Sequence, residues 1–264
     1  MKAKFDKTTL LGFLIAIGGV LGGFSIHEGK LEALWSGAAF TIVVVGSFGA
    51  VLVATPRRDV ILGIRGFTQA IEIRSGQFGA LREQILKLAS LARREGILAL
   101  DDYTNSKDSD PFLVKCLNQA IDGSSGEDLR ASVETDMDLR AADLHASARF
   151  WENWGAICPT VGILGAVLGL IEVVGHLDTP ERMGPGIASA FVATVYGVGF
   201  SNLVCLPIAF KLQRLAERED VRMSMVLEGV MGIQGGVAPG VLRSRLEVYL
   251  PPEEVRPREA EAKA

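Results

Sequence analysis

A pair of long apolar runs in the second half of this chain most constrains its fold. The first run, 154–174, reads WGAICPTVGILGAVLGLIEVV, and the second, 186–210, reads GIASAFVATVYGVGFSNLVCLPIAF. A helix needs about 20 apolar residues to cross the hydrocarbon core of a bilayer. Both runs are therefore predicted to be transmembrane helices, joined into a hairpin by the short link 175–185.

A second hairpin is predicted at the start of the chain, from apolar runs at about 8–26 and 34–54. A basic segment followed by an apolar run is also typical of a signal peptide. This run lacks a small-x-small cleavage site and another span follows at once, so we expect a retained helix. Basic residues follow each hairpin, and the positive-inside tendency then places both chain ends in the cytoplasm.

The remaining segments are predicted to form a helical cytoplasmic domain, 55–153, and a cytoplasmic segment, 211–264, made of a helix and a polar tail, 251–264, that is not expected to fold. Residues 57–76 alternate apolar and basic side chains, which favours a segment lying partly along the membrane surface. The chain is 48% hydrophobic with a mean hydropathy of +0.29. We therefore expect an all-α integral membrane protein with four transmembrane helices in two hairpins and without strands. The net charge of −4 argues against a nucleic-acid partner.

No catalytic or metal-binding pattern is found. The three cysteines are widely separated and two of them lie inside the predicted spans, so neither a disulfide framework nor a zinc site is expected. There is no phosphate-binding loop and no nucleophile with a neighbouring base. We therefore expect no enzyme activity, no metal and no cofactor.

One face of each later span is almost free of side-chain bulk. At helical spacing the third span aligns Gly155, Pro159, Gly162, Ala166 and Gly169, and the fourth aligns Ala190, Thr194, Gly197 and Ser201, with Tyr196 nearby. Two explanations stay open. The stripes pack against each other, as small residues commonly do between membrane helices, or they face a third helix and a narrow polar route beside it.

The two prolines inside these spans favour the second explanation. Pro159 cannot donate a hydrogen bond to the carbonyl of Gly155, and Pro207 cannot donate one to the carbonyl of Leu203. An unpaired carbonyl in hydrocarbon is costly, so such groups are tolerated where they face protein or a wet cavity. Both prolines are also candidate helix kinks.

Neither later span carries an ionisable residue in its middle, since Glu172 lies near the end of the third. A chain that relayed ions alone would be expected to carry such a group within the membrane. A titrating group would therefore have to come from a partner protein.

A charged cluster closes the amphipathic helix predicted over 78–100. Arg93, Arg94 and Glu95 precede a break at Gly96, and Asp101 and Asp102 follow it. A solvated charged face is the commoner explanation for such a cluster. A docking surface for a charged partner is the alternative.

Several motifs resemble the MotA/PomA family of flagellar-motor stator subunits. They are CPTVGILGAVLGLIEV and GPGIASAFVATVYGVGFSNLVCLPIAFKL in the later hairpin, TIVVVGSFGAVLVATP in the first, DPFLVKCLNQAIDGSSGEDLRASVETDMDLR before the third span, and VLEGVMGIQGG after the fourth. They cover nearly the whole chain in the family's order. The resemblance implies a ring of five copies in the bacterial inner membrane around two copies of a MotB-like subunit, whose single transmembrane helix carries an ion-binding aspartate. Ion flow turns the ring against a FliG-like rotor switch protein.

The family's residue roles carry over by position. Pro159 and Pro207 match its span prolines, and Thr194 matches the polar residue that faces the ion route. Arg93 and Asp101 match its rotor-facing basic and acidic positions. The family usually has glutamate at the acidic position, and here Asp101 and Asp102 adjoin, so which of the two contacts the rotor stays open. The basic assignment stays open as well, because Arg94 and Glu95 follow Arg93 directly.

The resemblance also bears on the transported ion. Sodium-type members tend to have a threonine seven residues after the third-span proline, where this chain has Ala166. An alanine offers no oxygen to a dehydrated cation, whereas a proton that hops through water and a carboxylate needs none. We therefore expect a proton-driven stator rather than a sodium-driven one.

Two other classes of function remain. An energiser of the ExbB/TolQ type also rings a partner helix, but it has one span before its cytoplasmic segment where this chain has the hairpin 8–54. A self-sufficient channel or transporter is disfavoured by the lack of an intramembrane charge.

Overall fold

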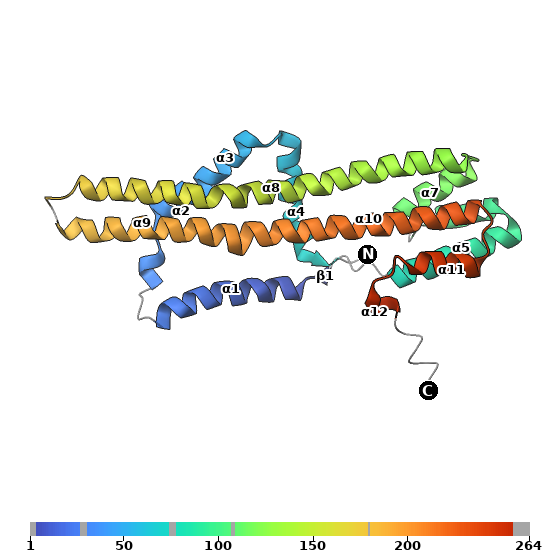
Figure 1. Ribbon diagram of the computed structural model, residues 1–264, viewed down its shortest axis with the longest axis horizontal. Helices are drawn as coiled ribbons and strands as arrows, with labels where there is room; N and C mark the ends of the chain where they lie inside the picture. The colour runs from blue at the N-terminus through green and yellow to red at the C-terminus, as the bar shows by residue number, and fades with distance from the viewer. Residues whose placement is uncertain (1–3, 27–30, 74–77, 107–108, 179, 256–264) are drawn as a thin grey trace, which may run out of the picture. The chain divides into compact units, whose positions relative to one another are not determined.

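The computed structural model describes residues 4–26, 31–73, 78–106, 109–178 and 180–255, and most of them are helical (Figure 1). It divides into two compact units, one formed by 1–74 with 143–215 and the other by 75–142 with 216–264. Two long helices, α8 (Gly126–Val174) and α10 (Leu206–Gln234), contribute residues to both units. The predicted cytoplasmic segment 55–153 is thus shared between them.

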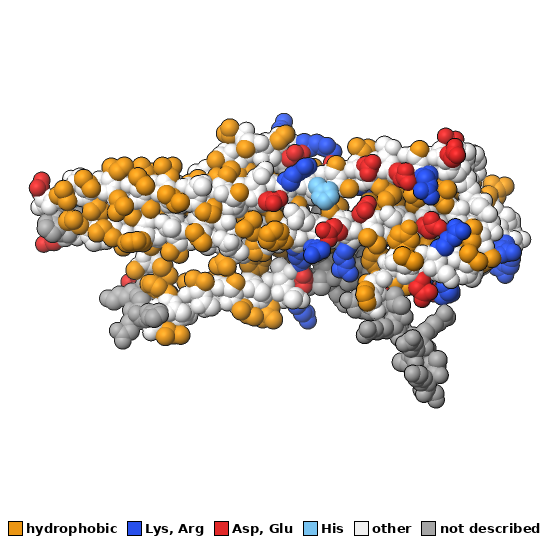
Figure 2. All heavy atoms as spheres, viewed as in Figure 1, with side chains coloured by type: hydrophobic (Ala, Val, Ile, Leu, Met, Phe, Trp, Pro, Cys, Tyr) orange, Lys and Arg blue, Asp and Glu red, His pale blue; other side chains and the backbone are white. Residues whose placement is uncertain are grey.

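The first unit holds the membrane spans. Four helical segments of the described chain are long and apolar enough to cross a membrane: Lys7–Ile26, Leu31–Ala54, Gly126–Val174 and Met183–Gln234. Their number and order are those predicted, and the all-helical class is confirmed. In Figure 2 the coloured side chains visible along α9 (Pro180–Phe200) and the end of α8 are almost all hydrophobic, which suits contact with lipid or with other apolar helices.

Two of the spans are not simple α-helices. The first span is the single helix α1 (Lys7–Ile26). The second span consists of four consecutive segments: the 3₁₀ turn η1 (Leu31–Leu34), α2 (Gly37–Phe40), the π-helical η2 (Thr41–Val45) and α3 (Gly46–Ala54). The fourth runs from α9 through the π-helical η4 (Ser201–Cys205) into α10. A π-helical turn inserts one extra residue into a helix, and side-chain periodicity gives little sign of it.

The prediction that the chain has no strands was wrong in one small place. β1 (Lys4–Phe5) pairs antiparallel with β2 (Glu72–Ile73), and the amide of Asp6 continues the pairing by donating to the carbonyl of Ile71 at 2.8 Å. Residues 4–5 precede α1 and residues 72–73 follow α4 (Arg57–Ile71). Their backbone groups lie outside a helix and therefore need other hydrogen-bond partners. A two-residue pair carries too little alternation to be visible in the sequence.

Asp6 also fixes the start of α1 to the end of the fourth span. Its carboxylate accepts from the amide of Thr8 at 3.0 Å, as an N-cap residue does, and from the hydroxyl of Thr9 at 2.7 Å. The Lys211 ammonium donates to the same carboxylate. That ammonium and the Thr9 hydroxyl hold the pKa of Asp6 well below its usual range.

Aromatic side chains pack around Trp154 where α8 enters the span region. Its ring centroid lies 4.9 Å from that of Phe48, 5.0 Å from that of Phe200 and 5.4 Å from that of Trp151. The Trp154 indole donates to the hydroxyl of Ser47, which is fully buried, at 2.9 Å. The cluster therefore fixes the second span against the third and fourth, with its polar atom paired.

Helix α4 (Arg57–Ile71) belongs to the same unit as the spans. It packs on α8 by placing two glycines directly against side chains of that helix: a Cβ on Gly63 would lie 2.3 Å from the Phe150 ring, and one on Gly66 would lie 1.9 Å from the Ser147 hydroxyl. The Trp151 indole donates to the carbonyl of Gly63 at 2.8 Å. Only glycine allows the two helices to come this close.

The second unit is built on α5 (Phe78–Glu95), α7 (Pro111–Ile121) and α11 (Pro239–Glu247), together with the adjoining parts of α8 and α10. The face of α5 predicted to be buried is buried: Leu81, Ile85 and Leu88 lie in its core. The tail 251–264 was expected not to fold, but Pro252–Val255 forms a short helix, α12, whose Glu254 carboxylate accepts from the amide of Gly79 at the start of α5. Residues 256–264 lie outside the described part of the chain.

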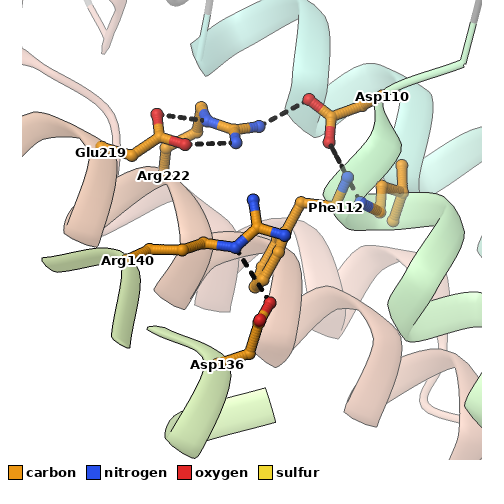
Figure 3. Close-up of polar contacts among 7 residues, drawn as sticks. Asp110, Phe112, Asp136, Arg140, Glu219 and Arg222 are labelled. Carbon is orange, nitrogen blue, oxygen red and sulfur yellow. Dashed lines mark hydrogen bonds and ion pairs between the residues drawn. The ribbon is translucent and has the colours of Figure 1, made fainter. Parts of the chain in front are cut away.

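Polar contacts join α7, α8 and α10 within this unit: ion pairs link α10 to the start of α7, and a cation–π contact links α8 to α7 (Figure 3). Arg222 reaches Asp110 at 2.5 Å and Glu219 at 2.6 Å, and Asp110 caps α7 by accepting from the amide of Phe112 at 2.9 Å. The Arg140 guanidinium lies over the Phe112 ring, 5.1 Å from its centroid. Because the Arg222 side chain is only 18% exposed, these pairs fix helix positions as well as neutralise charge.

The third and fourth spans approach each other closely through glycines. A Cβ on Gly197 would lie 2.7 Å from the carbonyl oxygen of Cys158, and one on Gly162 would lie 3.0 Å from the carbonyl oxygen of Ala193. The two predicted stripes therefore pack against each other at these positions. This is the first of the two explanations left open by the sequence.

Replacing Gly197 by alanine is expected to force the two spans apart. The added methyl group meets a backbone carbonyl that cannot move aside, so we expect a destabilisation of about 1–3 kcal/mol, measured as the free energy of unfolding in detergent. Gly199→Ala is the matched control, because it lies on the same helix and its Cβ would meet nothing within 4 Å. Equal stability of the two variants would contradict the close contact.

Candidate functional site

The carbonyl left unpaired by Pro159 has a partner on the neighbouring helix. Pro159 lies inside α8, where it cannot donate to Gly155. The hydroxyl of Ser201 donates instead to the Gly155 carbonyl at 2.6 Å, and Ser201 is only 2% exposed. The proline is therefore tolerated in the span because the next span supplies the missing donor.

Pro207 lies just after a local change of helix type. The π-helical turn η4, Ser201–Cys205, precedes it, and α10 continues beyond it to Gln234. A π turn shifts the backbone hydrogen-bond register, which places the irregularity next to the residue that lacks an amide donor. The same turn begins with Ser201, so both prolines depend on this part of the fourth span.

The second span covers one flank of the pair formed by α8 and α9. Ile42 lies against the Cβ position of Gly165, and Val161 lies against that of Gly46. The Tyr196 hydroxyl donates to the carbonyl of Leu34 at 2.6 Å, and Ser189 and Ser36 share a hydrogen bond of 2.9 Å. Tyr196, predicted as an ion-pathway residue, therefore ties the fourth span to the second.

The other predicted pathway residues lie on the opposite flank. Pro159 and Ala166 are seven residues apart on α8, and helical spacing turns both away from Gly165 and the second span. The same spacing turns Thr194 of α9 away from Tyr196. All three are partly exposed, and the side-chain hydroxyl of Thr194 makes no hydrogen bond to another described residue. The structure thus brings Pro159, Ala166 and Thr194 together on one open flank and separates Tyr196 from them.

This open flank is apolar apart from the Thr194 hydroxyl and the exposed side chain of Asn202, whose amide donates to the carbonyl of Val198 at 2.9 Å. Its neighbours at helical spacing are well exposed for large hydrophobic residues: Ile163 59%, Leu170 49%, Phe191 70% and Val198 48%. The spans contribute no carboxylate there, because Glu172 lies near the end of α8. A hydroxyl-bearing apolar surface of this kind suits the side of another helix.

The charged cluster lies at the end of α5 in the other unit. Gly96 has φ 88°, a left-handed conformation that favours glycine, and it turns the chain from α5 into the 3₁₀ helix η3 (Ile97–Leu100). The predicted residues on both sides of the turn are exposed: Arg93, Arg94, Glu95, Asp101 and Asp102. Asp101 and Asp102 open the short helix α6, Asp101–Thr104. The cluster is therefore available to a partner, as the docking interpretation requires.

Two features of this surface were not predicted from the sequence. Leu98 lies between the basic and acidic groups and is 71% exposed. A cleft of about 450 Å³ beside Arg94 is lined by Lys87 and by Arg243 of α11, the latter paired with Glu83 at 2.8 Å. That ion pair lowers the pKa of Glu83. Arg243 lies far from α5 in the sequence, and no local pattern connects them.

Comparison with known proteins agrees with this architecture. Residues 105–225 match the MotA/TolQ/ExbB proton channel family, and residues 10–96 match the N-terminal region of motility protein A. Motility protein A of Bacillus subtilis is 33% identical over 247 residues, which cover 93% of this chain and 91% of that protein. Chemotaxis protein PomA of Vibrio alginolyticus is 28% identical over 251 residues, covering 93% and 95%.

Solved structures with the same fold are also found. The C. jejuni MotAB structure matches with a TM-score of 0.89 and 27% identity, over 94% of this chain and 97% of that one. The flagellar MotAB stator complex of Bacillus subtilis matches with a TM-score of 0.86 and 31% identity, over 94% and 98%.

The four spans and the paired proline-bearing helices therefore define a multi-pass membrane protein of the MotA/TolQ/ExbB class. Within that class the chain belongs to the motility protein A family, the stator subunits of the flagellar motor.

The pairing of Ser201 with Gly155 can be tested by a double-mutant cycle. Ser201→Ala should destabilise the protein by about 1–3 kcal/mol, because it leaves a buried carbonyl without a donor. In a Pro159→Ala background the backbone amide of residue 159 can donate to Gly155, so the same substitution should cost much less. Free energies of unfolding in detergent give the coupling, and an equal cost in both backgrounds would contradict the assignment.

Proposed function

We propose that this chain forms the ring of a proton-driven stator and that its open flank receives the transmembrane helix of a MotB-like partner. The observation that carries the proposal is the grouping of Pro159, Ala166 and Thr194 on a flank that the second span leaves uncovered. The solved relatives are MotAB complexes, which supports a partner of this kind. An aspartate on the partner's helix would supply the carboxylate that this flank lacks.

The residues of the flank suit proton transfer to a borrowed carboxylate. The Thr194 hydroxyl is free of bonds to described residues, so it can hydrogen-bond a water molecule or the partner's carboxyl group. Ala166 offers no oxygen ligand, which disfavours a dehydrated sodium ion and leaves proton hopping as the proposed transport. No enzymatic step and no cofactor is proposed.

The charged surface at the end of α5 is proposed to act on the rotor. Its basic residues Arg93 and Arg94, with Glu95, and its acidic residues Asp101 and Asp102 are all exposed. Opposite charges on a FliG-like rotor protein would steer and align the contact. We further propose five copies per ring, as in the family the sequence resembles, and an inner-membrane location with both chain ends in the cytoplasm.

The family description that matches residues 105–225 also covers ExbB/TolQ-like energisers. The first hairpin favours the motor: residues 10–96 match the N-terminal region of motility protein A, and two apolar spans lie in that stretch.

Motility in sodium-free medium tests the choice of ion. When potassium replaces sodium at constant ionic strength, cells that depend on this stator should swim at unchanged speed, because no sodium ligand is built at Ala166. A protonophore should stop them. A motor that halts without sodium while the proton gradient is intact would overturn the proton assignment.

Replacing the Thr194 hydroxyl tests the open flank. Thr194→Val keeps the shape of the side chain but removes its hydroxyl, so motility should fall while the amount of protein in the membrane is unchanged. Thr194→Ser is the matched control, because it keeps the hydroxyl and should retain most of the motility. Normal swimming with valine would remove Thr194 from the proposed pathway.

A further inference from the structure

Helix α4 runs across the span helices instead of along them (Figure 1). It contacts both α8 and α10, because a Cβ on Gly66 would meet Ser147 of the first and Leu212 of the second. It begins at Arg57, directly after the second span ends at Ala54 and the chain turns at Pro56. A helix that crosses membrane-spanning helices at the end of a span lies along the plane of the membrane surface.

The two sides of α4 differ in what they contact. Gly63, Gly66 and Ala70 are buried against the neighbouring helices. The other side carries large apolar residues that are partly exposed: Ile61 42% and Ile64 54%. Phe67, at the edge of this stripe, is 38% exposed and packs one part of its ring on Trp151, with the ring centroids 5.8 Å apart. An exposed apolar stripe on a surface-lying helix is typical of helices that bind the boundary between lipid headgroups and acyl chains.

Arginines border this apolar stripe. Arg58 is engaged by Asp143 at 2.6 Å, whereas Arg57 and Arg65 are exposed and form no ion pair with any other described residue. Guanidinium groups bind phosphate through paired hydrogen bonds, and basic residues next to a membrane are attracted to anionic lipids. A second protein chain on this surface would have to match both the apolar stripe and two unpaired cations.

We propose that α4 is a binding site for anionic phospholipids. Its apolar stripe enters the membrane boundary, and Arg57 and Arg65 hold the phosphate groups of anionic lipids beside it. This assignment concerns the lipid around the stator and does not depend on the transported ion or on the rotor contact. It can therefore fail while the proposed function stands, and the reverse is also true.

Lipid binding to the purified full chain tests the role of the arginines. The chain in mild detergent is titrated with phosphatidylglycerol or phosphatidylcholine, and bound lipids are counted by native mass spectrometry. The wild type should prefer phosphatidylglycerol, and Arg57→Gln with Arg65→Gln should weaken that preference by roughly thirtyfold if each arginine contributes independently. Arg93→Gln with Arg94→Gln, which removes two exposed arginines elsewhere, should leave it unchanged.

An unchanged preference in the Arg57 and Arg65 variant would overturn the proposal. So would displacement of phosphatidylglycerol by millimolar inorganic phosphate alone, because the site would then hold a free anion and not a lipid.

The apolar stripe is tested separately in vesicles. A fluorophore on Ile64→Cys of the full chain should be quenched by brominated acyl chains, whereas one on Leu98→Cys, an exposed leucine of the charged surface, should not be. Absence of quenching at residue 64 would mean that protein covers the stripe, and would also contradict the proposal.

Discussion

Every backbone carbonyl within a bilayer needs a hydrogen-bond donor, and this requirement links the two later spans. Pro159 removes the donor that Gly155 would otherwise have, and Ser201 replaces it from the fourth span at 2.6 Å. The replacement works only if the helices are close, and Gly162 and Gly197 make them so. The prolines, the glycines and the serine therefore form one interdependent arrangement.

That arrangement leaves the helix pair with two unlike flanks. Tyr196 and Ser189 bind the start of the second span on one flank, while Pro159, Ala166 and Thr194 stay open on the other. The covered flank fixes the pair within the chain, and the uncovered flank is the surface on which a further helix can lie. A subunit that presents such a surface without a carboxylate is suited to work as part of a complex.

Much of this could be predicted from the sequence because its signals are local. Span length, the small stripes, the buried face of α5 and the break at Gly96 all follow from side-chain spacing within one helix. The donor to Gly155 could not be predicted, because Ser201 is 46 residues away and pairs only once the helices pack. The side of the helix pair on which Tyr196 lies likewise could not be predicted, because it depends on where the second span packs. The π-helical turns and the two-residue strands were missed because they are too short to show a periodic pattern of side chains.

The most direct measurement of the central claim is proton flux through reconstituted vesicles. Under an imposed pH gradient the chain alone should conduct no more than empty vesicles, and a single-span partner with a membrane aspartate should be needed for flux above that level. Proton flux by the chain alone, at a rate equal to that of the two-protein complex, would contradict the account.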